Sequence, residues 1–205
     1  MQPFHAVRSV PTPFRRANVD TDMIIPARFM KSITKEGLGS NVFRDIREGA
    51  DGAIKEARVF DDPRFSGSQI LLAGMNFGCG SSREHAVWAI AGYGFRCIIA
   101  ESFAEIFQGN CHKNGILTIS LPASEIDTLE TAAREKHEIN VDLERRYIER
   151  PDRSRLAFEV RDDVRENLLF GRDEIAQTLT SALSISRHEE RAKSRTPWLF
   201  SGQIH

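Results

Sequence analysis

The middle of the chain alternates between short apolar runs and segments with helical spacing. Residues 68–73, 97–100 and 117–121 are apolar runs of strand length, whereas 86–91 is an alanine-rich stretch that suits a buried helix. A second helical pattern covers 103–107. Because strands separated by a helix return parallel to one another, this order predicts an α/β fold with parallel strand pairing around two crossover units.

Shorter patterns frame this central block. Residues 1–17 contain three prolines and predict a short strand followed by an irregular connection. A helix is predicted over 124–133, a small hairpin over 139–149 and another strand at 156–160. The segment 29–43 carries two glycines among charged residues, which predicts a mobile surface loop.

The C-terminal part of the chain has a helical pattern. The positions that form an apolar helical stripe are Ile175, Leu179, Ala182 and Leu183. Such a stripe predicts a helix that docks on the core. Residues 187–195 are polar on every side and predict a solvated helix end, with contact to a partner as the alternative. We therefore expect one compact domain over 1–205, with a helical C-terminal portion from about 161 to 205.

The turn between the first apolar strand and the alanine-rich helix contains the residues best suited to bind or react with a ligand. Gly78 and Gly80 can adopt backbone angles that other residues avoid, and they let a ligand approach the main chain. Ser81 and Glu84 have capping-box spacing, which predicts a helix that begins at or next to Ser81. A helix start offers unpaired N–H groups and partial positive charge, and the planar guanidinium of Arg83 suits a carboxylate. The turn therefore predicts a site for an acidic ligand.

A purely structural alternative is that Ser81 and Glu84 cap a helix while Arg83 lies in solvent. Two glycines, two serines and an arginine within residues 78–83 favour a site over that alternative. Familiar phosphate loops do not fit, because the stretch has neither Gly-Lys-Ser/Thr nor the third glycine of the dinucleotide fingerprint. The serines also lie outside a Gly-x-Ser-x-Gly nucleophile elbow.

The residues Asn76 to His85, Asn-Phe-Gly-Cys-Gly-Ser-Ser-Arg-Glu-His, closely resemble the signature of the 3-isopropylmalate dehydratase small subunits, a family related to the mobile domain of aconitase. The other matching stretches, in the family's order, are Asn18–Pro26, Ser102–Phe107 and Asn110–Leu117. The resemblance is strongest over 1–122. It weakens after Asp173, where Glu-Ile-Ala-Gln stands in place of a glycine-containing stretch expected in the family.

This resemblance implies a three-layer β/β/α swivelling domain of the aconitase C-terminal domain type. It also implies a hydro-lyase that isomerises 2-isopropylmalate and 3-isopropylmalate by dehydration and rehydration in leucine biosynthesis. Ser81 matches the family's catalytic base, a serine that takes a carbon-bound proton as its alkoxide. Ser82 and Arg83 match residues that hold a substrate carboxylate. Arg28 is a further candidate contact for the substrate, and Lys31 is a weaker one.

The resemblance implies a role for two further stretches. In the family, the polar turn 18–22 lies near the active site, although a purely structural turn is an equal alternative. The loop 29–43 would help to set specificity for the substrate side chain.

The family's [4Fe-4S] cluster acts as a Lewis acid and is carried by a separate large subunit. The chain has three widely spaced cysteines and no Cys-x-x-Cys, so we expect the cluster on the partner and none bound here. A formal net charge of -1 provides no field for nucleic acid, and the longest apolar run, 86–91, is far shorter than the ~20 residues that span a bilayer. The N-terminus lacks a secretory pattern, so cytoplasmic residence is expected. The resemblance implies a heterodimer with the large subunit and a small dicarboxylate substrate.

Three alternatives remain open at this point. A paralogue could handle 2-methylmalate and citraconate, dimethylmalate or homocitrate with the same machinery. A stand-alone serine hydrolase would use the serines without iron. A non-catalytic binding subunit would use the same turn only to hold its ligand.

Overall fold

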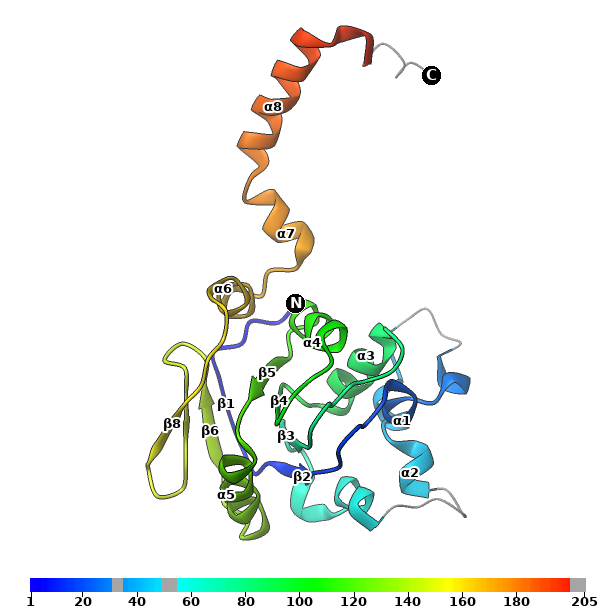
Figure 1. Cartoon of the computed structure of the whole chain (residues 1–205), viewed down its shortest axis with the longest axis vertical. Helices are drawn as coiled ribbons and strands as arrows, with labels where there is room; N and C mark the ends of the chain where they lie inside the picture. Colours follow the sequence, from blue (N-terminus) through cyan, green and yellow to red (C-terminus); the bar gives the residue numbers. More distant parts are fainter. Residues whose placement is uncertain (31–34, 49–54, 200–205) are drawn as a thin grey trace. The chain divides into compact units, whose positions relative to one another are not determined.

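Two sheets form the framework of the computed structural model, which describes residues 1–30, 35–48 and 55–199. The first sheet is parallel and has the strand order β2-β3-β4-β5 (Figure 1). Its strands are β2 (Thr12–Phe14), β3 (Ile70–Ala73), β4 (Cys97–Ala100) and β5 (Leu117–Ser120). Parallel pairing in the core, as the alternating pattern predicted, is confirmed.

The second sheet is antiparallel, with the order β1-β6-β7-β8. Its strands are β1 (Ala6–Ser9), β6 (Ile139–Asp142), β7 (Tyr147–Glu149) and β8 (Arg155–Ala157). The predicted hairpin is confirmed as β6 and β7. The N-terminal segment forms two strands instead of one, and these strands belong to different sheets. Pro13 is tolerated in β2 because this strand is at the edge of the parallel sheet.

The parallel strands are buried on both faces, which explains why their sequences are continuously apolar. In β3, Ile70 and Leu72 face a core shared with Val141 and Ile148 of the antiparallel sheet. Leu71, with its opposite orientation, belongs to a second core that contains the helices on the other face. The result is an antiparallel sheet, a parallel sheet and a helical layer, which confirms the three-layer β/β/α arrangement (Figure 1).

Helices connect and cover these strands. The α-helices of the first part of the chain are α1 (Thr21–Ile24), α2 (Arg44–Glu48), α3 (Glu84–Tyr93), α4 (Glu105–Lys113), α5 (Ala123–Arg134) and α6 (Asp162–Phe170). Short 3-10 helices cover Ala27–Phe29, Gly39–Asn41, Lys55–Phe60 and Pro63–Phe65. The helix predicted over 124–133 is confirmed as α5.

The segment expected to be a mobile surface loop is partly a packed element. Leu38, Val42 and Phe43 are buried in the helical core. Gly39 lies so close to α3 that a Cβ there would be 2.2 Å from the carbonyl carbon of Gly92. The prediction of a surface loop is therefore wrong for the end of 29–43, because glycine at these two positions permits close packing of two backbones. Its residues 31–34 lie outside the described part of the chain.

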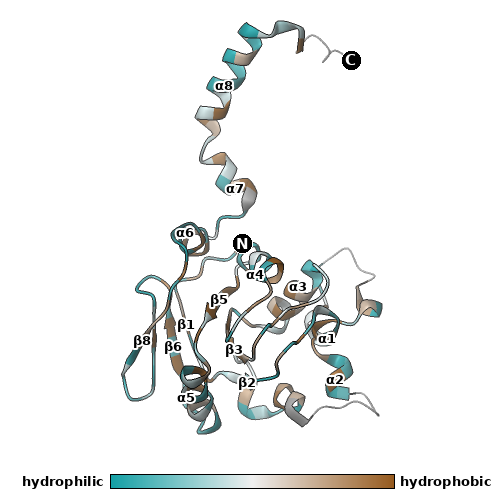
Figure 2. Cartoon of the chain, in the orientation of Figure 1, coloured by the Kyte–Doolittle hydropathy of each residue, from teal (hydrophilic) through white to brown (hydrophobic). Residues whose placement is uncertain are grey.

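The chain divides into two compact units, Met1–Gly171 and Arg172–His205. The second unit contains α7 (Glu174–Leu179), α8 (Ala182–Arg195) and a 3-10 helix (Pro197–Leu199). Figure 2 shows the polar composition of α8. Docking of the apolar stripe on the core, and a single domain over 1–205, stay predictions. Within the described ranges, no helix has the length and hydrophobicity that are needed to cross a bilayer.

Candidate functional site

The glycine- and serine-rich turn lines a cavity of about 230 Å³. The turn follows β3, and the helix on the other side of the cavity, α4, follows β4. The lining residues are Thr21, Gly78, Gly80, Ser81, Ser82, Arg83, Ala104, Glu105, Ile106, Phe107 and Asn110. The cavity thus lies beyond the carboxyl ends of two parallel strands, where open α/β sheets commonly bind ligands.

Two glycines determine the backbone conformation of this turn. Gly78 has φ +78°, and a Cβ at this position would lie 2.1 Å from Cγ of Phe107. Gly80 has φ +88°, which is also a conformation that side chains disfavour. The N–H of Gly78 donates a hydrogen bond of 2.8 Å to the carbonyl of Val19. Close packing on α4 therefore requires glycine at position 78.

The polar turn of residues 18–22 braces the glycine turn. The backbone N–H of Thr21 donates to the carbonyl of Cys79 at 3.0 Å, and the Thr21 hydroxyl donates to the carbonyl of Ser81 at 3.0 Å. Asp20 caps α1 by accepting a hydrogen bond of 2.7 Å from the N–H of Met23. These contacts place the two polar segments of the sequence side by side, although 60 residues separate Thr21 from Ser81.

The predicted capping box at Ser81 is wrong. Helix α3 begins at Glu84, with Arg83 as the preceding residue. The Glu84 carboxylate accepts hydrogen bonds from Nε1 of Trp88 at 3.2 Å and from Nδ2 of Asn114 at 2.7 Å, so it is engaged away from Ser81. The Ser81 carbonyl accepts a hydrogen bond of 2.8 Å from the N–H of Arg83, which makes a tight bend before the helix. Ser81 therefore lies in this bend and not in the helix cap.

Ser81, Ser82 and Arg83 converge on the cavity. Both serines are exposed, and the Arg83 side chain is 29% exposed. The Arg83 guanidinium forms an ion pair with Asp22, the residue after Thr21. Two hydroxyls and a guanidinium at one small cavity suit a carboxylate ligand, which would compete with Asp22 for the guanidinium.

The structure places Arg28 outside the described lining of this cavity. Its guanidinium pairs with Asp45, with one N–O distance of 2.8 Å, and lies 4.5 Å from the centre of the Phe29 ring. A contact between Arg28 and the substrate therefore stays a prediction. Lys31, the weaker candidate, lies outside the described residues.

Sequence reasoning missed three residues of the site. Thr21 and Asp22 were read only as parts of a polar turn, although Thr21 braces Ser81 and Asp22 pairs with Arg83. Ile106 was read as an apolar helix position, but its side chain is 60% exposed at the cavity. The first two contacts join residues about 60 positions apart, so that no local spacing could reveal them.

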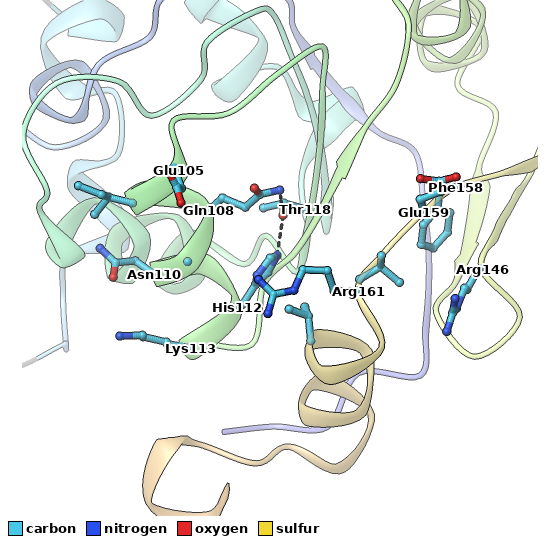
Figure 3. A pocket seen from close by; sticks show the side chains of 14 residues that line it. Glu105, Gln108, Asn110, His112, Lys113, Thr118, Arg146, Phe158, Glu159 and Arg161 are labelled. Carbon is cyan, nitrogen blue, oxygen red and sulfur yellow. Dashed lines mark hydrogen bonds between the residues drawn. The ribbon is translucent and has the colours of Figure 1, made fainter.

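A second, larger cavity of about 1040 Å³ lies on another side of α4 (Figure 3). Its lining includes the half-buried His112, whose Nε2 lies 2.7 Å from Oγ1 of the buried Thr118, while Nε2 of Gln108 donates to the same oxygen at 3.1 Å. The pKa of His112 is lowered from 6.5 to about 4, chiefly because burial removes water from the ring and also because Arg161 is near. The contacts of His112 indicate a structural role for a neutral imidazole ring.

We expect His112 to make the fold sensitive to acid. Its pKa is lower in the folded chain than in the unfolded chain, so the unfolded state takes up the proton first as the pH falls. The free energy of unfolding should therefore decrease between pH 6.5 and pH 4, by at most about 3 kcal/mol from this group. Urea titrations of wild type and His112→Gln at several pH values measure the contribution of His112 to the pH dependence of the free energy of unfolding. The exposed His137, changed to Gln, is the control, and equal pH slopes in all three proteins would contradict the assignment.

Among residues 1–30, 35–48 and 55–199, no group of three or more His, Cys, Asp or Glu side chains could hold a metal ion. Cys97 and Cys111 are buried, and burial raises the pKa of both thiols, so they remain protonated. Cys79 is partly exposed beside the candidate site. The described residues therefore do not offer the thiolate set that an iron–sulfur cluster needs.

Comparison with known proteins defines the class of this fold. Residues 1–124 match the family model of the aconitase C-terminal domain. Residues 174–202 match the C-terminal domain of the 3-isopropylmalate dehydratase small subunit. The expected weakening of the resemblance after Asp173 is therefore wrong.

Full-length relatives define the family more narrowly. The 3-isopropylmalate dehydratase small subunit of Hahella chejuensis is 49% identical, with 98% of this chain and 99% of the relative covered. That of Paramagnetospirillum magneticum is 46% identical, with coverage of 97% and 100%. The crystal structure of 3-isopropylmalate dehydratase from Methanocaldococcus jannaschii has a TM-score of 0.65 at 26% identity and covers 89% of this chain and 99% of its own. The chain belongs to the family of 3-isopropylmalate dehydratase small subunits.

Proposed function

We infer that the chain is the small subunit of a cytoplasmic 3-isopropylmalate dehydratase. The complex would interconvert 2-isopropylmalate and 3-isopropylmalate in leucine biosynthesis, by removing water and re-adding it at the neighbouring carbon. Family membership supports the reaction class. The single observation that supports a role for this chain in the chemistry is the convergence of Ser81, Ser82 and Arg83 on one open cavity.

Ser81 is the proposed base. As an alkoxide it removes the proton from the carbon next to the one that bears the hydroxyl, the electron pair of that C–H bond forms the alkene, and the hydroxyl group departs. Ser81 is then a neutral hydroxyl, which returns the proton when water adds in the other direction. Stabilisation of the alkoxide comes from positive charge nearby, namely the Arg83 guanidinium and the start of α3 at Glu84.

Ser82 and Arg83 are the proposed carboxylate contacts, with Arg28 as a further candidate. The planar guanidinium of Arg83 can bind two carboxylate oxygens at once. Its present partner, Asp22, is 54% exposed, so exchange of that carboxylate for a substrate carboxylate requires little rearrangement of the core. Asp22 would then keep Arg83 oriented in the absence of substrate.

A separate large subunit is the proposed carrier of the [4Fe-4S] cluster. When bound, the cluster supplies a Lewis acid for the departing hydroxyl. Under this proposal, activity depends on the complex with the large subunit. The chain itself supplies the base and the carboxylate contacts.

The substrate is tested by reconstituting the purified chain with its large subunit under anaerobic conditions. We expect the highest kcat/KM with 2-isopropylmalate or 3-isopropylmalate, and much lower values with 2-methylmalate, dimethylmalate and homocitrate. A preference for one of these other acids would assign the chain to a paralogous hydro-lyase. Ester hydrolysis by the chain alone, without iron, would instead support a serine hydrolase.

A further inference from the structure

Ile106 is an exposed aliphatic residue in the first turn of α4. Its side chain is 60% exposed, although most large apolar side chains of this unit are buried. Ile106 lines both the cavity that contains Ser81 and the larger cavity that contains His112. Glu105 and Asn110 also line both cavities, so the two hollows are adjoining parts of one surface with α4 between them.

The larger cavity has two walls from distant parts of the sequence (Figure 3). One wall consists of α4 and Thr118 of β5, and the other consists of 158–164 with Arg146 of the hairpin. Apolar side chains from both walls line it, namely Ile106, Phe158, Val160 and Val164. At about 1040 Å³ it is far larger than the 230 Å³ catalytic cavity, so its size suits a protein segment better than a small dicarboxylate.

Charge in this cavity also disfavours a small anionic ligand. The Arg161 guanidinium is paired with Asp163, at 2.6 Å, and Arg146 is paired with Asp162. The other charged side chains of the lining are Glu105, Glu159 and Lys113, so the lining as a whole is of mixed charge. A ligand that relied on these arginines would have to displace their carboxylates. Apolar contact with a polar rim is instead the usual composition of a protein interface.

We propose that Ile106 and the cavity of about 1040 Å³ beside it form a docking groove for the cluster-carrying large subunit, which inserts an apolar segment there. This inference rests on the proposed function. Relatives that cover nearly all of this chain are named small subunits, which implies a large subunit as partner. Under the proposed function, that subunit brings the cluster to Ser81 and so covers the 230 Å³ cavity. Because Ile106 is on the rim of both hollows, a partner over Ser81 also covers Ile106 and reaches the larger cavity.

The test measures the dissociation constant between the full small-subunit chain and the large subunit. We expect Ile106→Glu to raise this constant at least about 30-fold, because a buried carboxylate without a partner is costly in an interface. Ile106→Leu should remain near wild type. Ala123→Glu is the matched control, since it introduces the same carboxylate at an exposed position in the first turn of another helix, α5.

A second variant tests the far wall of the groove. Glu159 is exposed in the larger cavity, and Glu159→Trp would fill space that the partner is expected to occupy. We expect at least about 10-fold weaker association, with the thermal unfolding midpoint unchanged. At saturating large subunit, the kcat of Glu159→Trp should be close to wild type, because Glu159 lines only the larger cavity.

Two results would contradict the proposal of a docking groove. Wild-type association of both Ile106→Glu and Glu159→Trp would place the partner elsewhere. Normal association of Ile106→Glu with a raised KM would show that Ile106 contacts substrate instead. Failure of the proposed function gives a different result. If Ile106→Glu weakens association but the wild-type complex turns over none of the acids, the docking groove is supported and the proposed reaction is refuted.

Discussion

Replacement of Ser81 by alanine is expected to lower the kcat of the reconstituted complex about 1,000-fold, within the range that general acid–base catalysis contributes. The Ser81 side chain is exposed at the cavity, and the contacts that shape the bend use its backbone carbonyl. The fold, the cavity and association with the large subunit should therefore be unchanged. Initial rates with both isopropylmalates, at saturating substrate and large subunit, measure the loss.

Two further variants test whether the loss of kcat is specific to the Ser81 hydroxyl. Ser66→Ala removes an exposed hydroxyl that lies before β3 and outside the lining of the Ser81 cavity, and it should have wild-type kcat. Ser82→Ala should act mainly on KM, since Ser82 is a proposed carboxylate contact. Wild-type kcat in Ser81→Ala would remove the base role and would favour a non-catalytic binding subunit.

Substitution of Arg83 by lysine is expected to raise the KM for isopropylmalate roughly 30-fold, which corresponds to about 2 kcal/mol of lost carboxylate binding. Lysine keeps the positive charge but cannot form the paired, planar contact of a guanidinium. Because Arg83 is also near the proposed alkoxide, a smaller decrease in kcat should accompany the change in KM. Steady-state kinetics with the saturated complex separate the two effects.

Two other substitutions serve as comparisons for the KM of Arg83→Lys. Arg145→Lys alters an exposed arginine of the β6–β7 hairpin and should leave the kinetic constants unchanged. Asp22→Asn removes the carboxylate that now pairs with Arg83 and should lower KM, provided that Arg83 keeps its position. An Arg83→Lys enzyme with wild-type KM would exclude Arg83 as a substrate contact.

Much of the fold could be predicted because the parallel strands are buried on both faces. Continuous apolar runs such as 70–73 and 97–100 then identify strands, and their helical connections specify parallel order. The packing of Gly39 against Gly92 could not be predicted, because it joins two glycines that no local pattern relates. The two strands within 1–17 were likewise missed, since their pairing partners are 59 or more residues away.

Composition singled out the turn that lines the 230 Å³ cavity, but it did not predict the local geometry of that turn. Capping-box spacing at Ser81 and Glu84 predicted a helix start that does not occur, because Trp88 and Asn114 engage the Glu84 carboxylate. Ser102 also stands three residues before a glutamate, Glu105, and it does not cap the helix that follows. The Ser102 hydroxyl accepts a hydrogen bond of 2.8 Å from the N–H of Asn76, and α4 begins at Glu105. In both cases a long-range partner outcompetes the local cap.

Transfer of a carbon-bound proton to Ser81 is most directly tested by isotope exchange. The reconstituted complex is incubated with 3-isopropylmalate in D2O, and deuterium at the substrate carbons is followed by NMR spectroscopy. The proposed mechanism predicts incorporation with wild type and with Ser66→Ala, and a loss in Ser81→Ala that matches its loss of turnover. Wild-type rates of deuterium incorporation in Ser81→Ala would show that another group removes the proton.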